Sequence, residues 1–508
     1  MAAGSLTWFA RHELDLFWRD WTSLIVRGKA HRKLLAGIVL AVFIVGRHLV
    51  AWVTMTETVD LARLNAKAVY IFVSGSALVS LSMMVSQSLE SVTRAFYARA
   101  DLDLILTSPA PSSRIFTIRI CAVALMSVVM TALLVAPFLN VMAWLEGPVW
   151  LLGYVSLLSM SAIATSVSVM IAILLFRTIG PKRTRSIAQI VAAVIGAGFA
   201  IAMQIIAILF YGNISRLSVL TASDVAEKLP DASSALWVPA RALVGDAGAV
   251  FVFALAGFGL LALTIRLFSS RFADLALSTA GVKEHSGRNS RQPTQFRATT
   301  VRGALRRKEL VLLARDPWLL SQTLMQLLYL LVPGFLLWRN HGADLGAVIV
   351  VVPVIVMAAG QLAGGLAWLT ISGEDAPDLV QSAPVSAQAG LRAKIEAVLV
   401  AVGMGLVPII LGLAIADFRA AIITIVCVVC SAGAATIMQV WFRAQAKRSH
   451  FRHRHASSKI ATFAEAFSSI SWAGAGALTI VGSWFAILPI LSALGVLGFI
   501  RVIRPRGE

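Results

Sequence analysis

The chain has 508 residues, of which 58% are hydrophobic and only 14% charged, and this balance excludes a water-soluble globular protein. About twelve apolar runs follow one another, each near the roughly 20 residues that cross a bilayer core of about 30 Å. We therefore expect an all-α polytopic membrane protein, because only helices and closed barrels satisfy their backbone in lipid. In a soluble domain, a net charge of +19 would indicate nucleic-acid binding. In this chain the distribution of the basic residues indicates another explanation, given below.

The first predicted element is an amphipathic helix over residues 5–30. Leu14, Phe17 and Trp21 recur at helical spacing, while charged residues take the other faces. Tryptophan on such a face favours the headgroup boundary, so we expect this helix to lie along the membrane surface. Six spans are then predicted at about 34–55, 68–88, 118–141, 150–176, 188–212 and 249–268.

The second half of the chain repeats this order. Residues 269–301 are polar, lack apolar periodicity and are predicted to be a cytoplasmic linker between the repeats 1–268 and 302–508. A second interfacial helix is predicted over 302–316, ended by Pro317. Six further spans are predicted at about 318–338, 345–371, 396–416, 420–441, 461–481 and 484–503, with a turn near Gly482 between the last two.

Two short motifs occur once in each half, in the same order. The sequence RHELDLFWRD at 11–20 matches RKELVLLARD at 307–316, and DLILTSP at 103–109 matches DLVQSAP at 378–384. A basic residue follows each proline by ten positions, Arg119 in one half and Lys394 in the other. This pattern indicates a duplication, and an even number of spans per half makes the two halves parallel repeats.

The distribution of basic residues predicts the orientation. Of the 44 lysines and arginines, 36 fall on the side of the predicted topology that holds both termini, and seven fall in loops on the other side. The positive-inside rule then places both termini in the cytoplasm. It also accounts for the high net charge through contact with anionic lipids rather than nucleic acid.

Catalytic and metal-binding motifs are missing from the sequence. No phosphate-binding loop of the form GxxxxGK[ST], no HExxH and no GxSxG occurs. Cys121, Cys427 and Cys430 lie in apolar runs and are interpreted as packing residues. The histidines of RSHFRHRH at 448–455 are interleaved with arginines that would repel a cation, so a basic loop against phospholipid is the preferred interpretation.

A few residues inside predicted spans stand out. Arg47 and His48 lie within the first span, where charge is costly and marks a candidate site in the substrate path; snorkelling of the side chains to the interface is the equally weighted alternative. Gly360 and Gly364 form a small-xxx-small pair that favours close helix packing.

Acidic residues in both copies of the cytoplasmic loop are unusual, because the positive-inside bias favours bases there. A short helical segment with acids at its start and a proline at its end is suited to docking in a groove of a partner protein. Acids at a helix N-terminus are also favourable by themselves, but the duplication favours docking.

These motifs resemble the ABC-2 type permeases, the membrane subunits of ATP-binding-cassette exporters. The resemblance covers both surface helices, both loops between the second and third spans, and LWVPARALVGD at 236–246. A typical member has six spans and pairs with another copy, whereas here both halves lie in one chain.

The resemblance implies a function and a set of site residues. The loops would be coupling helices that contact a separate cytoplasmic ATPase, through Asp101, Asp103, Leu104, Pro109 and Arg114 in one half and Asp375, Asp378, Leu379 and Pro384 in the other. The connecting helices would include Glu13, Arg19, Asp20, Glu309, Arg315 and Asp316. It further implies a bacterial inner-membrane exporter with two ATPase subunits per chain, which bind ATP and magnesium while this chain binds no cofactor and is not itself an enzyme.

Two other functions stay open from the sequence. A secondary transporter driven by an ion gradient also favours two six-span repeats, but it would need a buried carboxylate within a span, and none is convincingly placed. Glu57, Glu396 and Glu465 all lie near the ends of spans. A membrane-embedded lipid or sugar transferase is the weakest alternative, because no acidic catalytic cluster is visible. The substrate cannot be derived from the sequence.

Overall fold

The fold was analysed in a computed structural model of the whole chain. It describes residues 41, 43–56, 66–97, 111–211, 229–269, 300–315, 345–372, 384–441 and 459–503, and the isolated positions 11, 12, 15, 324, 328, 330–332, 335 and 382. The chain divides into two compact units, residues 1–289 and 290–508. This division falls inside the stretch that the sequence predicts as a linker.

The described residues are helical and include nine helices long and apolar enough to cross a membrane. They bear out a multi-pass, all-helical membrane protein. Nine of the predicted spans coincide with these helices; of the other three, the first is described over Phe43–Thr56, 461–481 is observed as a more polar helix, and 318–338 lies largely outside the described residues. Apolar side chains such as Phe251 and Leu255 are 69% and 66% exposed, as expected for surfaces that face lipid.

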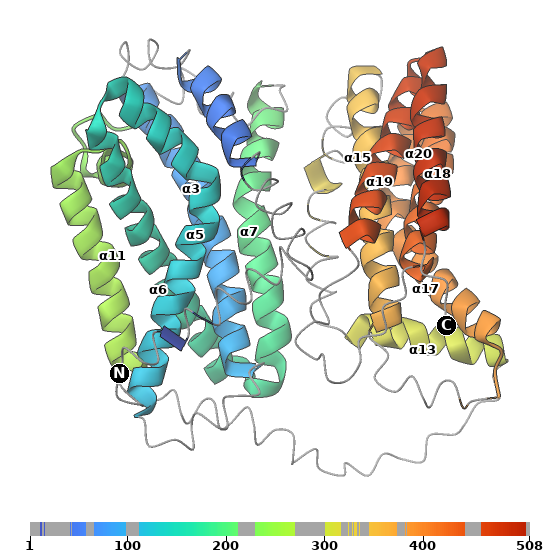
Figure 1. Cartoon of the computed structure of the whole chain (residues 1–508), viewed down its shortest axis with the longest axis horizontal. Helices are drawn as coiled ribbons and strands as arrows, with labels where there is room; N and C mark the ends of the chain where they lie inside the picture. Colours follow the sequence, from blue (N-terminus) through green and yellow to red (C-terminus); the bar gives the residue numbers. More distant parts are fainter. Residues whose placement is uncertain are drawn as a thin grey trace. The chain divides into compact units, whose positions relative to one another are not determined.

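The first unit is a bundle of upright helices (Figure 1). After the helix Phe43–Thr56 come α3 (Ala66–Tyr97), α5 (Ser112–Glu146), η1 (Pro148–Leu152), α6 (Gly153–Ile179), α7 (Pro181–Tyr211), η2 (Ala235–Trp237), α10 (Val238–Leu243) and α11 (Ala247–Phe268). Helix α6 is the most buried of them and packs against α3, α5, α7 and α11.

Serines of α6 hold this bundle together. Ser168 donates to the carbonyl oxygen of Val85 in α3 at 3.0 Å, and Ser161 donates to that of Ala124 in α5 at 2.6 Å. Because lipid tails are as apolar as leucine, membrane helices associate through such hydrogen bonds and close packing of small residues rather than through a hydrophobic effect. The small and hydroxylated residues of α6 therefore make it the central helix.

The second unit is also a bundle of helices. It contains α13 (Val301–Arg315), α15 (Leu345–Ser372), α17 (Ala387–Ala416), α18 (Phe418–Trp441), α19 (Lys459–Ile480), η5 (Trp484–Ala486) and α20 (Ile487–Ile503). Helix α15 packs against α18 and α19, as α3 packs against α6 and α7. Ser431 of α18 donates to the carbonyl oxygen of Val356 in α15 at 3.2 Å, which corresponds to the Ser168–Val85 contact of the first unit.

The GQLAG pair forms a helix contact, as the sequence predicts. A methyl group added at Gly360 would overlap the hydroxyls of Ser469 in α19 and Ser431 in α18, and one added at Gly364 would overlap the carboxylate of Glu465. The turn between α19 and α20 also lies where it is predicted, at Gly482 with a φ of 76° and the capping residue Ser483.

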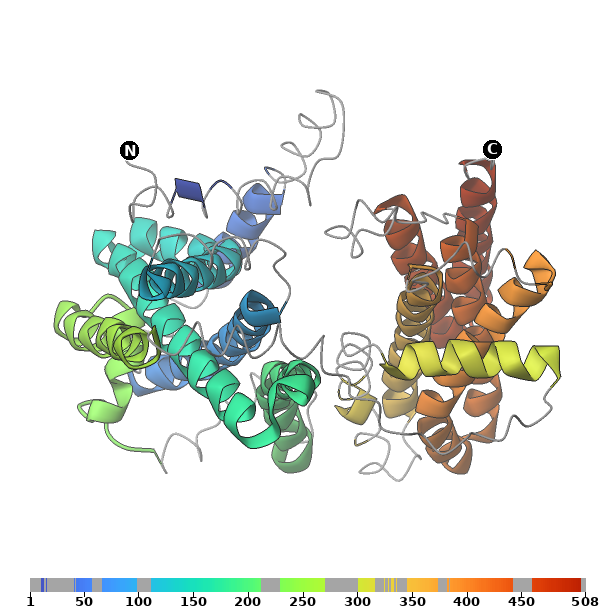
Figure 2. The ribbon, with the colours of Figure 1, turned by 90° about the horizontal axis from the view of Figure 1, so that it is seen from below.

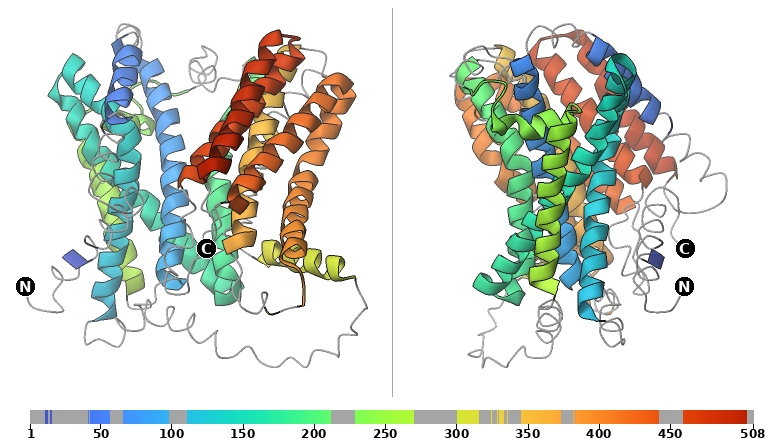
Figure 3. Two further views of the ribbon diagram at one scale, coloured as in Figure 1. Left: turned by 45° about the vertical axis from the view of Figure 1, so that its right-hand side comes forward. Right: turned by 90° about the vertical axis from the view of Figure 1, so that its left-hand side faces the viewer.

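Helix α13 runs across the ends of α15 and α17 instead of parallel to them (Figures 1, 2 and 3). It is described as far as Arg315, and the predicted breaker Pro317 lies outside the described residues. Among its described side chains only Glu309 and Leu313 are buried. Its attachment therefore combines the buried Leu313 with ion pairs to α17.

The LWVPARALVGD segment folds into a small cap on the first unit. Arg241 donates through Nε and Nη2 to Oδ2 of Asp246 at 2.9 and 2.7 Å, and Oδ1 of Asp246 accepts from the backbone N–H of Ala249 to cap α11. Gly245, with a φ of 96°, lies against the carbonyl of Val149, where a side chain would clash. The capping hydrogen bond and the Arg241 guanidinium lower the pKa of the Asp246 carboxyl.

The lowered pKa predicts an acid-dependent contribution of Asp246 to stability. A depressed carboxyl pKa stabilises the fold above its unfolded value of about 3.8, and the contribution is lost as pH falls through the folded value. We expect the Tm of the wild type to fall more steeply than that of Asp246→Asn between about pH 5 and pH 3. Asp231→Asn, an exposed acid of the same segment, is the control; parallel curves for wild type and Asp246→Asn would contradict the assignment.

Candidate functional site

The best-defined cluster of charged residues joins α13 to α17. Glu309, the acid of the repeated RKELVLLARD motif, is 3% exposed and lies 3.1 Å from Nζ of Lys394. Lys394 is the base that follows the DLVQSAP motif by ten positions, and its side chain is 19% exposed. The two motifs that the duplication singled out are therefore joined directly by an ion pair in the second unit.

Lys394 has a second partner that involves a third helix. Its ammonium donates to the backbone carbonyl of Thr370, in the last turns of α15. Carbonyls of the last turn of a helix have no partner within the helix, and a cation there also interacts favourably with the helix dipole. Lys394 thus links α13 to the end of α15 and the start of α17, the two helices that precede and follow residues 373–386 in the sequence.

A second ion-paired contact lies one turn away on the same two helices. Glu396 accepts hydrogen bonds from Arg302 and from Arg306, both in α13. The Glu396 side chain is 23% exposed, and those of Arg302 and Arg306 are 69% and 46% exposed. Water screens these exposed pairs, so they contribute little to stability, whereas the Glu309–Lys394 pair is largely buried.

The remaining predicted coupling and connecting residues are mostly outside the described part of the chain. This applies to Glu13, Arg19, Asp20, Asp101, Asp103, Leu104, Pro109, Asp316, Asp375, Asp378 and Leu379. Arg114 is exposed in the first turn of α5, and Pro384 is exposed just before Ser386, which caps α17. Arg315 is the last residue of α13. The structure thus describes the base of the second loop and not the loop itself.

Arg47 and His48 contact α5 of the same unit. Nη2 of Arg47 donates to the carbonyl of Leu134 at 2.8 Å, and its guanidinium carbon lies 5.3 Å from the centre of the Phe138 ring. Pro137 lies inside α5 and removes one backbone N–H, which loosens the helical hydrogen bonding around this carbonyl. Arg47 is therefore held by a carbonyl and an aromatic face within the bundle.

His48 belongs to a directed chain of hydrogen bonds. Its Nδ1 lies 2.8 Å from the carbonyl oxygen of Ile44, which can only accept, so Nδ1 carries the proton. Nε2 then accepts from Nδ2 of Asn140 at 3.2 Å, and Oδ1 of Asn140 accepts from the hydroxyl of Tyr154 at 2.7 Å. These partners fit the neutral imidazole.

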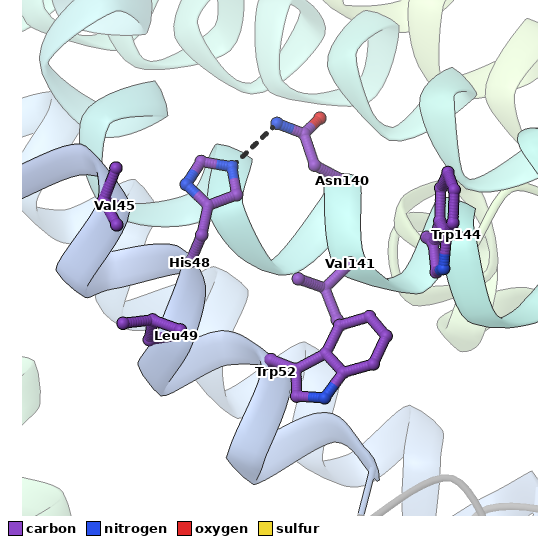
Figure 4. A pocket seen from close by; sticks show the side chains of 7 residues that line it. All are labelled: Val45, His48, Leu49, Trp52, Asn140, Val141 and Trp144. Atoms are coloured by element: carbon purple, nitrogen blue, oxygen red, sulfur yellow. Dashed lines mark hydrogen bonds between the residues drawn. The ribbon is translucent and has the colours of Figure 1, made fainter. Parts of the chain in front are cut away.

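A groove of about 370 Å³ lies beside His48 (Figure 4). His48 and Asn140 provide its polar groups, and the other lining residues are Val45, Leu49, Trp52, Val141 and Trp144. The groove is formed by the helix Phe43–Thr56 and α5. Its walls are apolar, and several of their side chains, such as Leu49 and Trp144, are also exposed on the surface of the unit.

The three carboxylates that an ion-coupled transporter would use differ in their environment. Glu57 lies outside the described residues. Glu396 is held by two arginines. Glu465 is 8% exposed in α19 and accepts a hydrogen bond from Nε2 of Gln439 in α18 at 2.8 Å. Of the two described carboxylates, Glu465 is therefore the more deeply buried and the one without a basic partner among the described residues.

Other predicted features can be placed only in part. Cys427 is buried, Cys430 is partly buried and Cys121 is exposed, and all three are free thiols. The histidine-rich stretch at 450–455 lies outside the described residues. Among the residues that the structure describes, no group of three or more metal-ligating side chains gathers at one place.

The chain was compared with known proteins at three levels. No protein-family model, no curated protein and no solved structure matches it.

The sequence indicated several of the site residues but not the residues that they contact. Lys394 was noticed for its spacing, but nothing in the sequence pairs it with Glu309, 85 positions away, or with a backbone carbonyl. Asn140 and Tyr154 were not singled out, although both are polar residues in apolar segments. That contrast is the one sequence signal that could have identified them.

The Glu309–Lys394 contact predicts strong energetic coupling. Glu309→Gln and Lys394→Met should each lower the free energy of unfolding by about 2–4 kcal/mol, because removal of either partner deletes the ion pair that the largely buried Glu309 carboxylate makes with α17. The double variant should lose clearly less than the sum of the two. The measurement is a double-mutant cycle on thermal unfolding in detergent, with Arg307→Met, an exposed base of α13, as an additive control.

The duplication predicts the same coupling in the first half. Glu13 and Arg119 occupy the motif positions of Glu309 and Lys394; Glu13 lies outside the described residues, and Arg119 is buried in α5 at 3% exposure. We expect the cycle of Glu13→Gln and Arg119→Met to be non-additive in the same direction. Additive effects would show that the repeats have diverged here.

Proposed function

We propose that this chain is the membrane subunit of an ATP-driven exporter and that a separate cytoplasmic ATPase drives its conformational changes. The proposal includes a bacterial inner-membrane location, twelve spans and cytoplasmic termini. The loops at 100–119 and 374–384 would contact two ATPase subunits, which bind ATP and magnesium. This chain would form the substrate path, with Arg47 and His48 as candidate residues along it.

The observation that carries this proposal is the attachment of Lys394 to both ends of one of these loops. A coupling element must pass a displacement to the helices instead of absorbing it. Residues 373–386 begin directly after α15 and end directly before α17, and Lys394 joins these two helices to α13. A push on this loop would therefore move three elements together.

The charge of α13 supports the proposed orientation. Arg302, Arg306, Arg307 and Lys308 lie on this short helix, and it crosses the ends of the upright helices instead of entering their layer. A basic helix in that position suits the anionic cytoplasmic leaflet. The resemblance to ABC-2 permeases predicts the same position for a connecting helix.

Energy coupling by this route follows ordinary thermodynamics. A partner can shift a two-state equilibrium only if it binds the two states with different affinity. An ATPase pair that closes on ATP would contact both loops in one state of the membrane subunit and release them in the other. The chain then needs no nucleotide site of its own.

The first test is isolation of the tagged chain from its native membranes in mild detergent. We expect an ATP-hydrolysing subunit to co-elute at close to two copies per chain, measured by mass spectrometry and by ATPase assay. Elution of the chain alone, under conditions in which other membrane complexes survive, would favour the ion-driven transporter instead.

The second test is a pair of substitutions in the loops. Asp103→Asn combined with Asp378→Asn should abolish the change in ATPase rate that the reconstituted chain causes in its partner, while membrane insertion stays normal. Asp224→Asn combined with Asp231→Asn, two acids of the predicted outer segment, is the matched control. If the loop variant changes the ATPase rate of the partner as much as the wild type does, the assignment of these loops to ATPase coupling is wrong.

A further inference from the structure

The carboxyl group of Glu465 lies in the interior of the second unit. Its side chain is 8% exposed in α19, and Gly364 of α15 packs directly against the carboxylate. A side chain at position 364 would occupy the same space, so the glycine creates the room that the carboxyl fills. The Glu465 carboxyl is therefore an integral part of the contact between α15 and α19.

The polar surroundings of this carboxyl are sparse. Nε2 of Gln439 donates to Oε2 of Glu465 at 2.8 Å. Ser469 donates to the backbone carbonyl of Glu465 rather than to its side chain. Ser468, one turn along α19 from Glu465, has a buried hydroxyl with no hydrogen-bond partner among the described residues. A neutral amide and a spare hydroxyl do not balance a negative charge.

No basic side chain compensates the carboxylate within the described residues. Glu465 forms no ion pair there, and α15 and η5, which pack on α19, contain no titratable residue. In α18 the titratable residues are Cys427, Cys430 and Arg419, and Arg419 lies about 30 Å along the helix from Gln439. Helix α20 contributes Arg501, which is exposed, and Lys459 begins α19 itself.

An ionised carboxylate in such a place would be very unfavourable. Burial of an unpaired charge costs far more than burial of the neutral acid, and in practice such a group takes up a proton. In membrane proteins, acids that face the interior of a helix bundle mark proton or ion pathways.

We propose that Glu465 is a proton-binding site. Its carboxyl carries a proton at neutral pH, with Gln439 donating to the oxygen that lacks the proton. The acid releases its proton to water when α15 and α19 separate, and the carboxylate takes it back before they close. The inference does not depend on the ATPase coupling proposed above.

Infrared spectroscopy of the full chain in lipid vesicles tests this inference. We expect a carboxylic-acid C=O band at neutral pH that shifts in D2O and is lost in Glu465→Gln. Glu396→Gln, which removes a carboxylate held by two arginines, should keep the band. No such band in the wild type, or a band that persists in Glu465→Gln, would overturn the proposal.

Two further measurements keep the test decisive if Glu465→Gln does not fold. Gln439→Leu keeps the acid and removes its donor, so the band must move; an unmoved band would overturn the assignment. Because the folded state holds a proton that the unfolded state releases, the Tm of the wild type should fall as pH rises from the unfolded carboxyl pKa of about 4.3 to neutrality. A Tm of the wild type that does not change over that range would contradict a bound proton.

Discussion

The ammonium of Lys394 is the contact on which the organisation of the second unit depends. It brings the acid of α13 and the carbonyl end of α15 to the first turns of α17. Without it, Glu309 would be a largely buried carboxylate beside a partly exposed Lys308, and the last carbonyls of α15 would need another donor. The interfacial helix is consequently attached by charge as well as by its buried Leu313.

Lipid as solvent explains why both units place polar groups in their interior. An apolar surface gains nothing by leaving lipid for protein, so hydroxyls and small residues determine which helices meet. Serines of α6 and α18 donate to backbone carbonyls of the helices they cross, and Gly360 and Gly364 bring α15 close to α19. The same preference explains why α6 and α18 are among the most buried spans although they are less uniformly apolar than α11.

The sequence predicted the helical spans well and their contacts poorly, for a physical reason. A run of about 20 apolar residues is fixed by bilayer thickness and can be read locally. The contact partners of a residue depend instead on which helices pack together in the fold. Spacing identified Lys394 and burial cost identified Arg47 and His48, yet neither indicated Glu309, Leu134 or Asn140 as the partner. Glu396 and Glu465 looked equivalent as acids near the ends of spans, and only their neighbours, two arginines in one case and Gln439 in the other, separate them.

Helix α15 connects the two sites of the second unit. Its residue Gly364 faces the carboxyl of Glu465, and Thr370, six residues and about 9 Å further along the helix, is bound by Lys394. A helix is stiff over that distance, so a displacement at Thr370 moves Gly364 as well. Any movement of the loop after α15 that tilts the helix would therefore change the space around Glu465 and its access to water. In the proposed exporter, the step that the ATPase drives and the protonation of Glu465 would then be coupled through one rigid element, and by linkage each would alter the free energy of the other.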